Sequence, residues 1–369
     1  LITPGFAGLN KQDSSNTATV GPQFAIELLN GVFDESGRLA ARKGWLSQAP
    51  TPISGSPNIE ATGEFIKADG TTSIVSAATN KLWAGLTSYT DITGTLTITA
   101  NNWQMINFTD AIFGFQEAHA PFRYTGAGNA AIITPTSGTV PTGGVACAAY
   151  GRIWATKTDG FTIQYCGLLD YQNWGAAGSG SIDMRNIWTK GSDTVMGITA
   201  FAGALVIFGR NHIVFLRDGT NAALGLDPSK FFVDDVITGT GLLARDTIQA
   251  VGEGDVWFLS PYGVQSLGRA IQIKNAPLTT VSNNVKDYLR TYLASENLLK
   301  IRSLYSPVNA AYLLILPTAG RVFYFNSRYP LQDGSYRTTE WTSMAPFCGV
   351  NRVNGDVLFG FAGRLGLYS

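Results

Sequence analysis

A short pattern recurs along the chain and limits the folds that the sequence can adopt. Each copy starts with a turn-forming residue, passes through one variable position and enters an apolar or aromatic run. A few turn residues follow, and then a second segment in which apolar and polar side chains often alternate. Such alternation is the period of a half-buried strand, so each copy predicts an antiparallel β-hairpin. The copies start at Asn80, Asp110, Gly151, Gly203, Gly254 and Gly355, with a looser copy at Ala310.

The spacing of these copies favours a β-propeller. Successive copies start roughly 30 to 55 residues apart, which brackets the roughly 40–50 residues of a four-stranded propeller blade. Blades pack face to face, so outer loops of unequal length leave their contacts intact. We therefore predict a mostly β chain that forms a propeller of about six to seven antiparallel blades. The alternative is a β-sandwich, for which the regular start of each copy has no evident reason.

Residues 282–302 break the pattern of strands. Apolar side chains there recur at helical spacing from Val285 onward, and Ser282 precedes them as a candidate N-cap. We predict one inserted amphipathic helix at about 282–302. It is expected to pack against the propeller edge, with docking on a neighbouring subunit as the alternative. The predicted division of the chain is an N-terminal extension with a hairpin over residues 1–57, which makes assembly contacts, and the propeller over residues 58–369.

The charge balance excludes a strongly basic DNA-binding protein. The chain has 26 Lys and Arg residues against 26 Asp and Glu residues, and charged side chains make up only 14% of it. Soluble domains average roughly 25%. A neutral chain lacks the electrostatic field that draws a protein onto nucleic acid, so any such contact is expected to be local or weak.

Other features exclude further classes of protein. No run of about 18 apolar residues is present, so we expect no membrane insertion. The three cysteines, Cys147, Cys166 and Cys348, are too scattered for a disulfide framework or a zinc site, and buried free thiols are expected. The chain begins with Leu1 rather than Met, from which we expect part of a longer or processed protein.

Candidate catalytic residues are few. Both histidines, His119 and His212, fall in predicted turns and are expected to be exposed. The carboxylate pairs Asp234/Asp235 and Glu253/Asp255 could serve a glycosidase. However, neighbouring residues of a strand point to opposite faces, and acidic residues at a hairpin entrance commonly help to turn the chain. We therefore predict no catalytic, cofactor-binding or metal-ligating residues.

A second function remains open at this point. A carbohydrate-binding or carbohydrate-cleaving β-propeller would use exposed aromatic rings as stacking platforms. Trp174 and Tyr171 are the candidates for that role.

The N-terminal segment differs from a blade. It is expected to contain a short strand that ends at Asn30, a turn over Asp34–Gly37 and a return strand. The return strand carries Arg38, Arg42 and Lys43, the densest basic cluster in the chain. Taken alone, this cluster fits the solvated edge of a hairpin.

The same segment resembles a known family. The sequence opens with Pro4-Gly5-Phe6 and Gly8-Leu9-Asn10, and after Asn30 and an acidic-Gly turn it reads Gly37-Arg38-Leu39-x-x-Arg42-Lys43-Gly44. This order resembles the start of the tail nozzle proteins of short-tailed bacteriophages, also called tail tubular protein B or packaged-DNA stabilisation proteins. The terminal unit over residues 354–368 is similar to that group as well. The specific part of the resemblance spans Thr3–Trp45.

The resemblance implies a structural viral protein without catalysis. Family members form a homo-hexamer in the tail of the podovirus virion, beneath the portal and adaptor rings, and are assembled in the host cytoplasm. The tube contacts the tail adaptor and other tail proteins, retains the genome and lets double-stranded DNA pass during genome ejection. Arg38, Arg42 and Lys43 are then expected to be interface or lumen contacts. Family chains are usually longer, with added tip or platform segments.

Overall fold

The structure is a computed structural model, which describes residues 6–12, 23–189, 191–219, 226–252, 254–273 and 280–369. Within these residues the chain forms seven antiparallel sheets of three or four strands and two short two-stranded ribbons. This is the arrangement of a seven-bladed β-propeller, so the predicted fold class is confirmed. The chain divides into two compact units, one of residues 1–47, 243–361 and 365–369, the other of residues 48–242 and 362–364.

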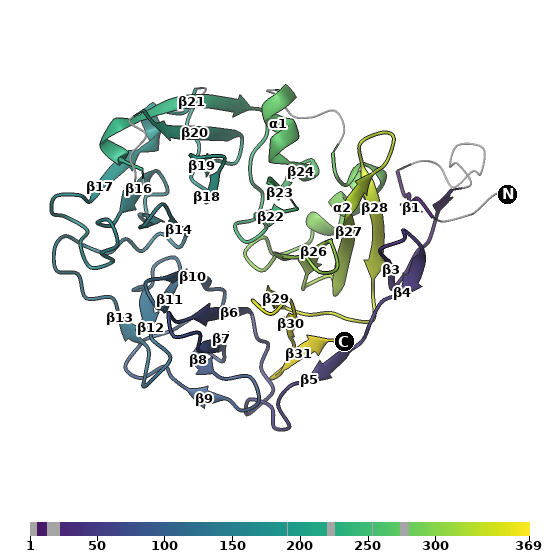
Figure 1. The fold of residues 1–369 in the computed structure, drawn as a ribbon, viewed down its shortest axis with the longest axis horizontal. Coiled ribbons are helices and arrows are strands. Elements are labelled where there is room, and N and C mark those ends of the chain that lie inside the picture. The colour runs from purple at the N-terminus through teal and green to yellow at the C-terminus, as the bar shows by residue number, and fades with distance from the viewer. Residues whose placement is uncertain (1–5, 13–22, 190, 220–225, 253, 274–279) are drawn as a thin grey trace. The chain divides into compact units, whose positions relative to one another are not determined.

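The second unit contains four blades of four strands each, in sequence order (Figure 1). The first strands of neighbouring blades contact one another, namely β6 with β10, β10 with β14, and β14 with β18. The strands are β6 (Ala61–Ile66), β7 (Thr72–Ala78), β8 (Lys81–Ala84), β9 (Thr90–Asp91), β10 (Gln104–Phe108), β11 (Ala111–Phe115), β12 (Phe122–Tyr124), β13 (Ala131–Ile132), β14 (Ala146–Ala149), β15 (Arg152–Thr156), β16 (Thr162–Tyr165), β17 (Gly180–Asp183), β18 (Gly197–Phe201), β19 (Ala204–Phe208), β20 (His212–Asp218) and β21 (Phe231–Thr238). Two 3-10 turns are also present: η1 (Met184–Asn186) follows β17, and η2 (Pro228–Lys230) precedes β21.

The apolar runs of the repeat are the second strands of the blades. In β11, Phe113 packs into the cluster shared with the next blade, whereas Ile112 packs into the cluster shared with the preceding one. In β15, Ile153 and Trp154 divide between two clusters in the same way. Successive strand residues point to opposite faces, and here both faces are covered by a neighbouring blade. The sequences of these strands are therefore nearly continuous apolar runs instead of alternating apolar and polar residues.

The first residue of every copy has a positive φ. The values are 54° for Asn80, 53° for Asp110, 72° for Gly151, 76° for Gly203, 105° for Gly254, 45° for Ala310 and 90° for Gly355. In four of these turns the residue before it also has a positive φ, as in a two-residue type I′ hairpin. This backbone geometry explains why most copies start with Gly, Asn or Asp. Six copies precede the second strand of a blade. The copy at Asn80 instead precedes β8, the third strand of its blade, because β7 is that blade's second strand.

The first unit contains the other three blades. They are formed by β22 (Gln249–Val251), β23 (Asp255–Ser260) and β24 (Gly263–Ser266); by β25 (Arg302–Ser306), β26 (Ala311–Leu316), β27 (Arg321–Pro330) and β28 (Tyr336–Trp341); and by β29 (Cys348–Asn351), β30 (Val357–Gly360), β31 (Leu365–Tyr368) and β5 (Trp45–Ser47). The last blade thus takes its fourth strand from the N-terminal part of the chain. The structure places Trp45–Ser47 in this blade, inside the segment predicted as an extension over residues 1–57.

The helical segment differs from the prediction. Helical structure within residues 282–302 is limited to a 3-10 turn, η3 (Asn283–Val285), and the helix α2 (Lys286–Leu293). Ser282 does not cap the helix through its side chain, because its hydroxyl accepts a hydrogen bond from the Val264 amide at 3.0 Å. Leu289 packs into the apolar core of its own unit, as expected for a connector on the propeller edge. A second helix, α1 (Leu267–Ile273), follows β24 and was not predicted.

No helix in the part of the chain that the structure describes has the length and apolar character needed to cross a lipid bilayer.

Candidate functional site

The predicted N-terminal hairpin is present as β3 (Gly31–Phe33) and β4 (Leu39–Ala41), with Asp34–Gly37 as the turn between them. The first strand starts after Asn30, however, whereas it was predicted to end there. Asn30 has a φ of 55° and so redirects the chain into the hairpin. The shorter ribbon of β1 (Gly8–Leu9) and β2 (Phe24–Ala25) precedes it.

The hairpin is attached to β28, the last strand of its blade. The Gly31 carbonyl accepts hydrogen bonds from the Thr339 hydroxyl at 2.6 Å and from the Trp341 indole at 2.9 Å. The Asn30 amide donates to the Glu340 carbonyl at 2.7 Å. These bonds cover part of the β28 edge, which would otherwise expose unpaired backbone groups.

Arg42 holds the base of the hairpin. Its Nε donates to Asn30 Oδ1 at 3.1 Å, and Nη2 donates to Ser343 Oγ at 2.7 Å. The guanidinium lies over the Trp341 ring, 5.8 Å from its centroid. Most of the hydrogen-bonding capacity of Arg42 is therefore used inside the fold.

Arg38 and Lys43 are arranged differently. The Arg38 side chain is 73% exposed and pairs with Asp34 at 3.1 Å. The hydrogen bond from the Arg38 backbone amide holds the pKa of the Asp34 carboxyl below its ordinary value. The Lys43 amide donates to the Tyr368 hydroxyl at 3.2 Å, while its side chain lines a cavity. The three basic residues of the sequence motif thus have different surroundings: Arg42 is bonded within the fold, Arg38 is exposed, and Lys43 lines the cavity.

Arg42→Ala should weaken the attachment of the hairpin. Three charge-assisted hydrogen bonds, to Asn30, Ser343 and the Lys43 carbonyl, and a ring contact are lost, which we expect to cost about 1–2 kcal/mol locally. Hydrogen exchange of the amides in β3 and β4 should accelerate accordingly. Arg38→Ala is the matched control on the same hairpin and should leave this exchange nearly unchanged. Equal exchange in both variants would show that Arg42 does not anchor the hairpin.

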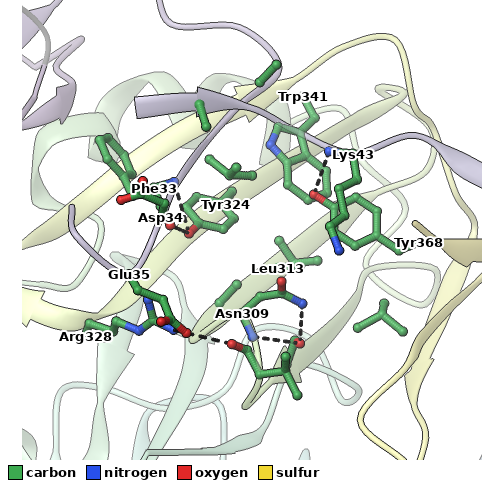
Figure 2. A pocket seen from close by; sticks show the side chains of 17 residues that line it. Phe33, Asp34, Glu35, Lys43, Asn309, Leu313, Tyr324, Arg328, Trp341 and Tyr368 are labelled. Atoms are coloured by element: carbon green, nitrogen blue, oxygen red, sulfur yellow. Dashed lines mark hydrogen bonds and ion pairs between the residues drawn. The ribbon is translucent and has the colours of Figure 1, made fainter. Parts of the chain in front are cut away.

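A cavity of about 360 Å³ lies between this hairpin and the sheet beneath it (Figure 2). Its base is apolar and aromatic and includes Phe33, Leu313, Tyr324, Trp341 and Tyr368. Its polar lining comes mainly from Asp34, Glu35, Lys43, Asn309 and Arg328.

The aromatic base is a continuous stack. The Trp341 ring lies nearly parallel to Tyr324, at 5.8 Å and 22°, and to Tyr368, at 5.7 Å and 18°. Burial raises the pKa of Tyr368 to about 12 and also raises that of Tyr324. Both hydroxyls therefore stay protonated and neutral near pH 7, so this base is a rigid apolar surface without acid–base chemistry.

The prediction of an exposed His212 is wrong. This side chain is 5% exposed, and its Nδ1 lies 2.9 Å from Oδ2 of the buried Asp193. Asp193 also accepts hydrogen bonds from the backbone amides of Thr194, Arg210 and Asn211. Burial alone would raise the pKa of Asp193, but the bonds from His212 and the amides outweigh it and lower this pKa. The Asp193 carboxylate therefore joins the segment before β18 to the turn between β19 and β20. These contacts account for His212 and Asp193 as groups that stabilise the fold.

The remaining candidates also have structural partners. His119 is half-buried in its turn and contacts Thr99 Oγ1 at 2.7 Å. Asp255 accepts hydrogen bonds from the Trp257 indole, Ser266 and the Gly268 amide, which join β23 to α1. Asp234 pairs with Arg217 at 2.8 Å, and Asp235 accepts from the Val236 amide. Glu253 lies outside the described residues.

The aromatic platforms expected for sugar binding are not both available. Trp174 is only 1% exposed and belongs to the core between two blades, which corrects its expected exposure. Tyr171 is half-buried, with the Arg123 guanidinium 4.8 Å from its ring centroid. No three His, Cys, Asp or Glu side chains of the described residues lie together as a metal site would need.

The cysteines mostly follow the expectation of buried free thiols. Cys166 and Cys348 are buried, whereas Cys147 is partly exposed, and all three are free. Burial raises the pKa of the Cys147 thiol to about 12 and that of Cys166 to about 11. These thiols are therefore poor nucleophiles near neutral pH.

Several solved β-propellers are similar to this chain. The streptogramin B lyase structure has a TM-score of 0.51 and 13% identity, covering 88% of this chain and 97% of its own. The WD40 propeller domain of Doa1 has a TM-score of 0.52 and 10% identity, and the match covers 89% of this chain and 97% of the Doa1 domain. An extracellular domain assigned to a one-component system of B. thetaiotaomicron has a TM-score of 0.54 and 10% identity, and the match covers 88% of this chain and 40% of that domain's chain. At such identities the likeness shows the fold alone. No protein-family model and no curated protein matches the sequence.

Proposed function

We propose that the chain is a structural subunit of a phage tail nozzle, which lines part of the channel for genome retention and ejection and has no catalytic role. The observation that carries this proposal is the Gly37–Lys43 stretch, which holds the family-like sequence. It folds as a defined hairpin on the outer strand of a blade, with the Arg38 side chain 73% exposed. An exposed basic group on a rigid element is suited to contact a neighbouring subunit or the phosphates of DNA.

The exposed strand of the hairpin supports a role in assembly. Leu39, Ala40 and Ala41 are all exposed, although the first of them is a large apolar residue. Among the described strands, β4 pairs with β3 alone, so its other edge is open. An open edge that carries apolar side chains favours association with another chain.

The charge of the chain suits a conduit. Each phosphate that a protein neutralises with Lys or Arg strengthens its hold on DNA, and a tight hold would oppose ejection. A subunit with 26 basic and 26 acidic residues has no net charge to create such a hold. We therefore expect DNA to pass through a homo-hexamer that joins the tail adaptor and other tail proteins in the virion.

Charge reversal on the hairpin tests this proposal. The double variant Arg38→Glu with Lys43→Glu should weaken association of the subunits by at least about tenfold, the equivalent of 1.4 kcal/mol, shift the assembled ring toward monomer and lower the infectious titre. Mass photometry and plaque counts measure the two effects. Lys230→Glu, an exposed position in the other unit, is the control and should change neither. Wild-type assembly and titre in the double variant would refute the role of the hairpin, and a stable monomer under conditions that assemble virions would refute the proposed function.

A further inference from the structure

The cavity beneath the hairpin combines a rigid apolar base with a volume suited to a small organic molecule. At about 360 Å³ it lies within the range of small-molecule sites, roughly 300–1,000 Å³, which are mostly apolar with a few polar groups. Stacked rings fix its base, and the hairpin that covers it is held by the two bonds to the Gly31 carbonyl.

The polar groups of the cavity leave one cation available. Asp34 is paired with Arg38, and Glu35 lies 3.4 Å from Arg328. Within the described residues, the ammonium of Lys43 has no carboxylate at ion-pair distance. Figure 2 shows the Lys43 side chain extending beside Tyr368 along the cavity. The cavity therefore offers an unpaired positive charge next to an apolar surface.

This combination selects an anion over a cation. Asp34 and Glu35 are already neutralised by Arg38 and Arg328, so a cationic ligand would gain less from them than a carboxylate would gain from an unpaired ammonium. The tyrosine hydroxyls are neutral, so they add no competing negative charge. An apolar group attached to the carboxylate would gain about 25 cal/mol for each Å² of its own surface that the cavity buries.

We propose that this cavity binds a small aromatic carboxylate, with its ring against the partly exposed Tyr368 and the apolar lining of the cavity, and with its carboxylate on Lys43. The site goes beyond the proposed role in a tail and does not depend on it, because binding is measured on the isolated chain. Val308 lines the rim of the cavity and is 63% exposed, so it marks where a ligand enters.

Calorimetric titration with 2-naphthoate and its neutral analogue 2-naphthamide tests the site. The carboxylate should bind more tightly than the amide. Lys43→Met should weaken 2-naphthoate about tenfold, bring it close to 2-naphthamide and leave the amide nearly unchanged. Lys43→Arg should retain binding to within about threefold, since it restores the charge.

Two further variants separate the cavity from general surface binding. Val308→Trp should block the entrance and weaken both probes, whereas Ile132→Trp, at an exposed position of the other unit, should affect neither. Lys230→Met is the control for loss of an exposed lysine. The proposal is overturned if 2-naphthoate does not bind up to millimolar concentration, if it binds no better than the amide, or if Val308→Trp leaves its binding unchanged.

Discussion

A chain that lacks residues 1–47 should be markedly less stable than one that lacks only residues 1–43, because only the longer deletion removes β5. In the intact protein Trp45 pairs with Tyr368, and Leu46 pairs with Leu367, along the edge of β31. The Trp45 ring also stacks on Phe361, with centroids 4.3 Å apart. Lost strand pairing and ring packing should cost about 3–5 kcal/mol beyond the effect of the shorter deletion. Urea denaturation of the two truncated chains measures this difference.

Gly366→Ala gives the same test in the full-length chain. A methyl group at this position would lie 2.4 Å from Cε3 of Trp45 and 2.9 Å from Phe361, closer than packed carbon atoms approach. Either the Trp45 ring moves or β5 separates from β31, at a cost of about 1–3 kcal/mol. Gly44→Ala is the control, because no atom lies within 4 Å of the added methyl group and the backbone there does not have a positive φ. Equal midpoints for the two truncated chains, together with an unaffected Gly366→Ala protein, would mean that β5 contributes little to the last blade.

Asp193→Ala should be the most damaging single substitution among the polar residues discussed above. It leaves the backbone amides of Thr194, Arg210 and Asn211 without their acceptor, and it removes the partner of the buried His212. A fully buried orphaned donor costs about 1–3 kcal/mol, and these amides are only part-buried, so a total loss of about 3–5 kcal/mol, including the buried His212, is expected after relaxation and entry of water. Asp234→Ala, which breaks the exposed pair with Arg217, is the control and should change the unfolding midpoint little.

The pH dependence provides a second readout for Asp193. Its pKa in the folded protein lies below the ordinary value of 3.8, so the folded state favours the ionised carboxylate. Its contribution to stability is therefore present above pH 3.8 and is lost as the pH falls through the lower, folded-state pKa. The wild-type protein should lose stability in this acid range more steeply than Asp193→Asn. Parallel curves for the two proteins would show that the ionisation of Asp193 is not linked to folding.

The fold could be predicted from the sequence because its strongest signal is local. Each second strand of a blade is covered on both faces, so its apolar run is continuous, and the turn before it requires a positive φ. Both signals fall within a few consecutive residues, and together they mark most blades. The copy at Asn80 has the same local form but precedes a third strand, which only the pairing of β7 with β6 and β8 reveals.

The candidate site could be predicted only in part. The turn and the basic residues of the hairpin are contiguous, so the sequence indicates them directly. The cavity, in contrast, is built from Phe33, Tyr324, Trp341 and Tyr368, which lie far apart along the chain. No spacing rule connects these residues. The same reason explains why the burial of His212 was not predicted. The sequence around it indicates an exposed turn, and its contact with Asp193 depends on the tertiary fold.

By itself, the sequence determined the blade-forming strands, the hairpin turn over Asp34–Gly37 and the neutral charge of the chain, since these follow from neighbouring residues or from composition. Tertiary structure alone decided which blade receives Trp45–Ser47, which side chains are buried, and that Lys43 faces an aromatic cavity while Arg42 anchors the hairpin. The physical reason is that turn geometry and strand periodicity act over a few residues, whereas strand pairing and side-chain packing depend on which distant segments the fold brings together.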